Sequence, residues 1–282
     1  MRVKTRPGPI TRTRIREING SVARDRRDDL ATEEPLEIRL TAPDGERRTV
    51  AITMRTPGHD FELAAGFLHG EGLVRPGGIA AIAYCTDEDL PPEARYNTVT
   101  VHIRGPIPDL PALDRHFLTS SACGVCGSAS LDALHDRCSP IPDGTLRISP
   151  DLLYGLPEAL RAAQGVFGKT GGLHAAGLFS AGGAPVAVRE DVGRHNAVDK
   201  LVGWAALTDH LPLAEHVLMV SGRASYEIMQ KALAAGVPVV CAVSAPSSLA
   251  VELAKEFGVT LVGFLRGERC NVYAGEHRLL MD

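Results

Sequence analysis

Residues 216–265 read HVLMVSGRASYEIMQKALAAGVPVVCAVSAPSSLAVELAKEFGVTLVGFL, and two patterns alternate along them. Three short apolar runs have the length and composition of buried strands: Val217–Val220, Val239–Val243 and Leu261–Leu265. The segments between them, Tyr226–Ala235 and Ser247–Phe257, have the length and pattern of helices. Strands that alternate with helices predict a sheet covered on both faces.

The same alternation extends upstream of this stretch. We expect helices at Leu152–Gln164 and Ala197–Leu207, and strands at Ala175–Phe179 and Val186–Val188. An α/β domain is therefore predicted for the second half of the chain. In such sheets the ligand crevice lies beyond the carboxyl ends of the strands.

The first part of the chain has a different pattern. Leu36–Leu40 alternates with period two, an Asp-Gly turn follows, and Val50–Met54 provides a second strand, so a β-hairpin is expected. Asp60–Leu68 reads as a helix that Gly70 closes. With further strands at residues 79–84 and 98–103, this part reads as a small α+β unit with an antiparallel sheet.

Length and composition bound the class of protein. A chain of 282 residues favours two domains. We divide it into a basic flexible tail (1–20), a small α+β domain (21–118), a linker loop (119–150) and an α/β domain (151–282). With a net charge of −4, the chain has no general attraction to nucleic acid or membrane. The arginine-rich start lacks the apolar region of a secretory signal, and six cysteines are too sparse for a disulfide scaffold, so we expect a cytoplasmic protein.

The linker loop carries the motif SACGVCGS at residues 121–128, in which Cys123 and Cys126 are flanked by small residues. Because the neighbouring side chains are small, both thiols can be exposed and another molecule can approach them closely. A C-x-x-C pair serves as half of a zinc site, as a redox dithiol, or as a relay that carries sulfur as a persulfide. The pair alone is compatible with all three chemistries.

Zinc and redox chemistry both lack part of their usual sequence context. A structural zinc site needs four ligands, and beyond Cys138, His116 and His135 no second half-site is evident. A thioredoxin-type dithiol should end a strand and open a helix within a βαβ unit, and the residues before Cys123 are a weak strand. A reactive thiol pair on a loop fits the sequence better. No permanently bound metal is predicted.

Arginines cluster at the ends of three expected strands. Arg194 and His195 follow one strand, Arg223 follows the next, and Arg266 and Arg269 follow the last. Guanidinium groups suit phosphates or a guanine edge because they donate paired hydrogen bonds. The sequence GKTGG at residues 168–172 is not a P-loop, because Ala163 stands where the first glycine is required. We therefore expect an anionic, nucleotide-like ligand at the ends of the sheet.

Together these stretches resemble the FdhD family, the accessory sulfurtransferases of formate dehydrogenase. The resemblance rests on Cys123–Gly127, Gly171–Ala176, Glu190–Lys200, Ser221–Arg223 and Phe264–Gly267. It implies an α+β N-terminal unit and a cytidine-deaminase-like three-layer α/β sandwich, assembled as a homodimer. A zinc nucleobase deaminase is not expected, since the H-x-E and P-C-x-x-C signature is missing where it is needed.

The resemblance also implies a function. The protein would take persulfide sulfur from a cysteine desulfurase and pass it to the molybdenum (or tungsten) bis-guanine-dinucleotide cofactor, the client that it binds, for the catalytic subunit of formate dehydrogenase. Cys123 and Cys126 would carry the sulfur. The residues expected to bind the cofactor are Phe264, Leu265, Arg266, Gly267, Glu268 and Arg269, extended to Arg194, His195 and Arg223. A zinc-stabilised cofactor-binding chaperone and a C-x-x-C redox protein are the alternatives.

Overall fold

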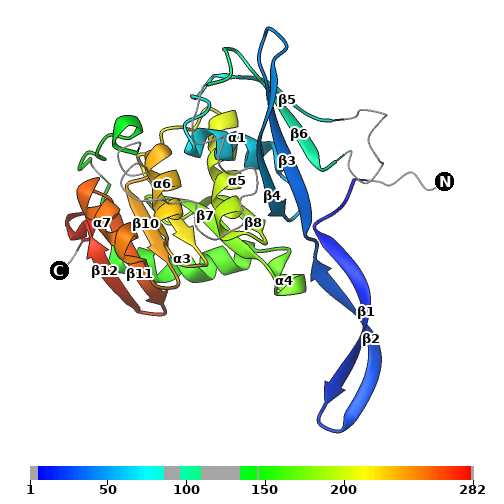
Figure 1. The fold of residues 1–282 in the computed structure, drawn as a ribbon. Coiled ribbons are helices and arrows are strands. Elements are labelled where there is room, and N and C mark those ends of the chain that lie inside the picture. Colours follow the sequence, from blue (N-terminus) through cyan, green and yellow to red (C-terminus); the bar gives the residue numbers. More distant parts are fainter. Residues whose placement is uncertain (1–5, 86–95, 109–133, 145, 281–282) are drawn as a thin grey trace.

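The computed structural model describes residues 6–85, 96–108, 134–144 and 146–280. Cys123 and Cys126 lie outside these residues. Three sheets organise the chain: a two-stranded arm, a four-stranded sheet and a six-stranded sheet (Figure 1). Within the described residues, no helix is long and apolar enough to cross a membrane.

The four-stranded sheet belongs to the N-terminal unit. Its strands are β3 (Glu34–Thr41), β4 (Arg47–Arg55), β5 (Ile79–Tyr84) and β6 (Thr98–Ile103), in the order β4-β3-β6-β5. The period-two pattern of β3 buries Leu36, Ile38 and Leu40 against helix α1 (Asp60–Gly70). The predicted hairpin and helix are confirmed. The expected antiparallel sheet is wrong at one junction, because β3 and β6 pair in parallel.

The six-stranded sheet forms the second unit. Its strands are β7 (His174–Ser180), β8 (Pro185–Asp191), β9 (His216–Val220), β10 (Val239–Ala242), β11 (Thr260–Arg266) and β12 (Arg269–Ala274). They are ordered β12-β11-β10-β9-β7-β8, with β9, β10 and β11 parallel. The last strand, β12, was not expected from the sequence.

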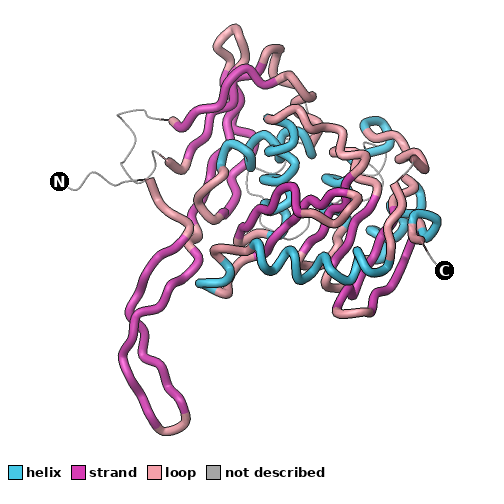
Figure 2. Tube along the Cα trace, turned by 180° about the vertical axis from the view of Figure 1, so that it is seen from behind, coloured by secondary structure: helices cyan, strands magenta, loops and turns pink. Residues whose placement is uncertain are grey.

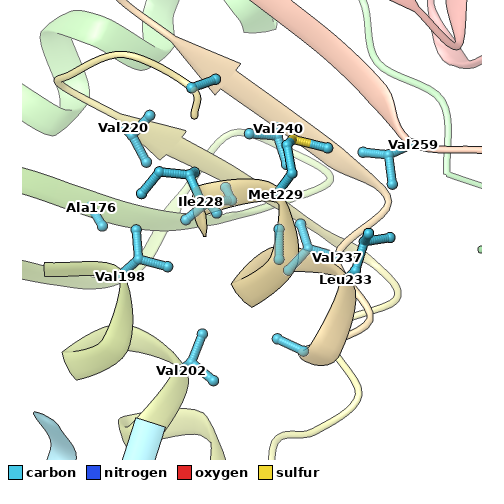
Figure 3. Close-up of a cluster of buried hydrophobic side chains, with 14 of the residues drawn as sticks. Ala176, Val198, Val202, Val220, Ile228, Met229, Leu233, Val237, Val240 and Val259 are labelled. Atoms are coloured by element: carbon cyan, nitrogen blue, oxygen red, sulfur yellow. The ribbon is translucent and has the colours of Figure 1, made fainter. Parts of the chain in front are cut away.

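Helices cover both faces of this sheet. One face packs against α5 (Arg194–Leu207), α6 (Tyr226–Ala234) and α7 (Ser248–Glu256), where side chains such as Val198, Ile228 and Val240 meet (Figure 3). The other face packs against α3 (Pro150–Ala163) through Leu156 and Leu160. The predicted three-layer α/β arrangement is therefore confirmed.

The N-terminal arm corrects the prediction of a flexible tail. Strands β1 (Ile10–Asn19) and β2 (Val22–Ala31) pair along their full length and project away from the body (Figures 1 and 2). Backbone pairing and cross-strand ion pairs such as Arg12–Asp29 hold the hairpin together, without a buried apolar face. Apolar periodicity, the main signal of a strand, was therefore absent from this stretch.

The two units meet where α1 crosses α5. A Cβ atom at Gly203 would lie 1.8 Å from the carbonyl oxygen of Glu62, and one at Gly66 would lie 1.8 Å from that of Asp199. Only glycine permits this approach of two helix backbones. Residues 134–144 also pack on the second unit, since Ile141 donates its N–H to the carbonyl oxygen of Phe257. This part of the expected linker is therefore docked.

Candidate functional site

The polar edge of the six-stranded sheet gathers five chain segments. The parallel strands β9, β10 and β11 end there. Strand β7 is antiparallel to β9, so its first residue, His174, lies at this edge, opposite Asp191 at the end of β8. Backbone hydrogen bonds connect neighbouring segments of this edge, from Ser247 N–H to the Ala224 carbonyl and from Phe264 N–H in β11 to the Ser244 carbonyl. The arginine-bearing strand ends therefore lie along one edge, as expected.

Asp191 fixes the start of α5 from a fully buried position. Its Oδ1 accepts hydrogen bonds from Gly193 N–H (2.8 Å) and Asn196 Nδ2 (3.0 Å). Its Oδ2 accepts from Thr56 N–H (3.1 Å) and lies 2.7 Å from Lys200 Nζ. This network stabilises the strand-to-helix turn and clips it to the N-terminal unit, so the side chains that follow are held by a rigid base.

Lys200 and Glu190 also have structural partners. Lys200 Nζ donates to the carbonyl oxygens of Thr56 (2.9 Å) and Glu190 (3.2 Å). The Glu190 carboxylate accepts from the N–H groups of Val166 (2.9 Å) and Phe167 (2.7 Å), at the start of the short helix α4 (Phe167–Thr170). Most polar side chains of residues 190–200, at the end of β8 and the start of α5, therefore hold the backbone in place.

Arg194 is the member of this stretch with an unused donor. Its Nε is buried and has no hydrogen-bond partner among the described residues. The side chain passes Gly222, where an added Cβ would lie 3.6 Å from Arg194 Cδ and 3.5 Å from His174 Nδ1. A buried guanidinium N–H without a partner is costly. An anion at this edge would satisfy it.

His174 contributes a neutral imidazole beside this guanidinium. Burial lowers its pKa below the ordinary histidine value, and the charges of Arg194 and His195 lower it further. At pH 7 the ring is therefore uncharged and offers one donor and one acceptor. Arg194 supplies a permanent positive charge at this point of the edge.

His195 is held on both ring nitrogens. Its Nδ1 lies 2.7 Å from Oε2 of Glu227, and its Nε2 lies 3.2 Å from Oγ of Ser225. The hydrogen bond from His195 lowers the pKa of Glu227, so this carboxylate is ionised at neutral pH. Ser225 occupies the N-cap position of α6 without a side-chain cap. The ring orientation is thus fixed by two residues of the next strand-to-helix junction.

The end of β11 and the start of β12 present an exposed aromatic residue and two arginines. Phe264 has a φ of 52°, which is unusual for a bulky residue, and its side chain is 38% exposed. Such strained positions concentrate at functional sites. Arg266 and Arg269 lie opposite each other across the turn at Gly267, and both are exposed, as is Glu268. Arg223 is exposed on the β9–α6 loop.

Leu265 is the one expected cofactor contact whose side chain points elsewhere. It is fully buried in the core on the α3 face of the sheet. Alternation along β11 explains this, because neighbouring side chains of a strand face opposite sides. Only the backbone of Leu265 is available to a ligand.

Three residues at the edge were missed in the sequence: His174, Ser225 and Glu227. Strand β7 runs antiparallel to both β8 and β9. Its first residues therefore lie beside the last residues of these two strands, which the order of elements in the sequence does not show. The motif at residues 171–176 contains His174 and was the available signal.

Three of the four described cysteines are poor nucleophiles. Burial raises the pKa values of Cys138, Cys241 and Cys270. Cys241 lies in the core as a small buried hydrophobic residue. His135, one of the candidate zinc ligands, lies 3.0 Å from Glu256 instead. In the described part of the chain, no cluster of three metal-ligating side chains occurs.

Comparison with known proteins gives consistent results. The model of the FdhD/NarQ family matches residues 31–280. The sulfur carrier protein FdhD of Streptomyces avermitilis is 53% identical over 281 residues, covering 97% of each chain. That of Nocardia farcinica is 51% identical over 256 residues, covering 90% of this chain and 89% of the relative.

A solved structure has the same fold. The putative formate dehydrogenase accessory protein of Desulfotalea psychrophila superposes with a TM-score of 0.73 at 24% identity, covering 96% of this chain and 99% of its own. The family match over most of the chain and the identity to full-length relatives lead to one conclusion. This chain belongs to the FdhD/NarQ family.

Proposed function

We propose that this protein is a cytoplasmic sulfurtransferase that serves formate dehydrogenase. It takes persulfide sulfur from a cysteine desulfurase and passes it to the molybdenum or tungsten bis-guanine-dinucleotide cofactor of the catalytic subunit. The names of its relatives, sulfur carrier protein and formate dehydrogenase accessory protein, support the coarse assignment. The observation that carries the proposed acceptor site is the buried, unpaired Arg194 Nε beside His174 and Gly222.

Sulfur uptake is a thiol exchange. The Cys123 thiolate attacks the outer sulfur of the desulfurase persulfide, the donor S–S bond breaks, and the donor cysteine leaves as a thiolate. Cys123 then carries the persulfide. The small residues around the pair at positions 121–128 allow a donor to approach closely.

Release uses the second thiol. The Cys126 thiolate attacks the inner sulfur of the Cys123 persulfide, a disulfide forms between the two cysteines, and the outer sulfur leaves as sulfide to the metal of the client cofactor. The cysteine pair is oxidised by two electrons and the transferred sulfur is reduced by two. A cellular thiol reductant returns the disulfide to two thiols before the next turnover.

The acceptor site uses the polar edge of the sheet. Arg194 would hold a phosphate of the guanine dinucleotide through its Nε–H, which has no partner among the described residues, with His174 as a neutral neighbour. Arg223, Arg266 and Arg269 add positive charge along the same edge, and Phe264 offers an aromatic face to the base. Gly222 lies between these two side chains, since an added Cβ there would be in van der Waals contact with both His174 and Arg194.

Nucleotide binding tests this site. Replacing Arg194 with alanine should weaken GDP binding roughly 10- to 100-fold, because a hydrogen bond to a charged group contributes about 1.5–3 kcal/mol. Isothermal titration calorimetry with GDP measures the dissociation constant. Arg104→Ala is the matched control, since Arg104 is exposed on the N-terminal unit and its Nε donates to the Gly77 carbonyl. Equal affinities of the wild type and Arg194→Ala would exclude the proposed phosphate contact.

A further inference from the structure

The hairpin arm, residues 10–31, is a structured element that the proposed sulfur transfer does not use. It projects from the body as a separate ribbon (Figures 1 and 2), and none of its residues is buried. An isolated two-stranded hairpin is marginally stable in water. The family model matches from residue 31, so the arm precedes the matched region. A contact outside this chain would stabilise it.

The β1 edge of the arm is protected against strand addition. A two-stranded ribbon leaves one row of backbone N–H and C=O groups unpaired along each strand, and such edges pair readily with other strands. Arg12, Arg14 and Arg16 share one face of β1 because they alternate along it. Two copies of β1 paired about Arg14 would place Arg12 opposite Arg16, and pairing about Ile15 would place Arg14 opposite Arg16. Like charges in these positions are destabilising.

The β2 edge has the opposite property, because its sequence VARDRRDDLA is self-complementary. In an antiparallel pair of β2 strands with a two-fold axis at Arg26, residues at equal distances on either side of Arg26 lie opposite each other. Arg24 then faces Asp28 of the second copy, and Asp25 faces Arg27 of the second copy. Val22 and Leu30, which are 64% and 44% exposed, also face each other. Opposite charges and apolar residues in such pairs are stabilising.

The charges of the free arm are consistent with this register. Arg27 lies opposite Arg14 within the hairpin, and no ion pair of either is seen in the described part of the chain. Asp25 has only a 3.8 Å contact with Arg16, between two exposed side chains. At the axis Arg26 faces Arg26 of the second copy, which is a like-charge pair. Each Arg26 has Glu17 and Asp28 of its own chain at 3.3 Å, and these carboxylates offset the repulsion. A second copy would bring Asp25 to the uncompensated Arg27.

We propose that β2 pairs with β2 of a second copy of this chain about a two-fold axis at Arg26. The two arms then form a four-stranded sheet whose outer edges are the arginine-bearing β1 strands, which stop further addition. Acidic residues interspersed along the arm make a nucleic-acid backbone a poor alternative. One pair of strands is a small interface, so this contact depends on protein concentration and weakens with salt.

Disulfide trapping tests the register. Opposed residues of an antiparallel pair have Cα atoms about 4.5–5.5 Å apart, within the range of a disulfide. Arg26→Cys in the full-length protein should therefore form a disulfide between the introduced thiols of two copies under mild oxidation, identified by peptide mass spectrometry. In the proposed register residue 24 faces residue 28 of the second copy. The two thiols of Arg24→Cys would therefore be separated by four residues along the strand, roughly 13 Å, and cannot form a disulfide. We expect the link between copies in Arg26→Cys and its loss in Arg24→Cys; equal yields, or no link in either variant, would overturn the proposal.

Charge reversal distinguishes pairing from a folding defect. Adding Arg27→Asp to Arg26→Cys places an acid opposite Asp25 of the second copy and should reduce the link severalfold. The same change places an acid opposite Arg14 of its own chain, which favours the hairpin itself. A further Asp25→Arg change restores opposite charges between the copies and should restore the link. If the protein remains a dimer and the yield of the disulfide responds neither to Arg27→Asp nor to Asp25→Arg, the copies associate through another surface. That result would overturn the proposal.

Discussion

Gly203→Ala should strongly destabilise the protein. The added Cβ would lie 1.8 Å from the Glu62 carbonyl oxygen, which is backbone and cannot rotate away. The two helices must therefore move apart, which disturbs the Arg189–Glu62 ion pair and the Lys200 contact with Thr56. We expect a loss of at least about 3 kcal/mol, the upper end for overpacked cores. Urea unfolding followed by circular dichroism measures the free energy.

Gly155→Ala is the matched control for this experiment. Gly155 lies inside helix α3, and an added Cβ there meets no atom within 4 Å. Alanine should therefore stabilise this helix by roughly 0.5–1 kcal/mol through its better helix propensity. If Gly203→Ala and Gly155→Ala unfold at the same urea concentration, the backbone contact between α1 and α5 does not hold the units together.

Cys123→Ala should abolish sulfur uptake. Among the described thiols, burial raises the pKa values of Cys138, Cys241 and Cys270, which keeps them protonated and unreactive. Intact mass spectrometry after incubation with a cysteine desulfurase and cysteine should show one added sulfur on the wild type and none on Cys123→Ala. Cys126→Ala should load sulfur and retain it, because the thiol that releases it is missing.

Two cysteine variants serve as controls for the uptake experiment. Cys85 and Cys270 are partly exposed, so their replacement by alanine tests whether any accessible thiol suffices. Both variants should load at the wild-type rate. Uptake by Cys123→Ala at the wild-type rate would refute the assignment of Cys123 as the carrier.

The sequence predicted those parts of the fold in which burial leaves a periodic pattern. The β3–β4 hairpin and the alternation of strands and helices after residue 150 were visible because their apolar side chains fill cores. The arm left no such pattern, since none of its side chains is buried. The parallel pairing of β3 with β6 depends on segments about sixty residues apart, which local patterns do not show.

The candidate site could be predicted in part. Its arginines were found because each follows an apolar strand, and parallel strands place their ends at one edge. His174 was missed because β7 runs antiparallel to β9. The role of Asp191 and Lys200 was also hidden, since both bind Thr56, more than a hundred residues away in the sequence. The crossing of Gly66 and Gly203 is equally remote in sequence.

The most direct test of the proposed transfer follows labelled sulfur from the thiol pair to the acceptor. The full-length protein is loaded with radiolabelled sulfur by a cysteine desulfurase, separated from it, and mixed with molybdenum bis-guanine-dinucleotide cofactor. We predict that label leaves the protein and joins the cofactor, and that Arg194→Ala slows this transfer roughly 10-fold or more. Label lost at the same rate with and without cofactor, or equally fast from Arg194→Ala, would contradict the proposed transfer.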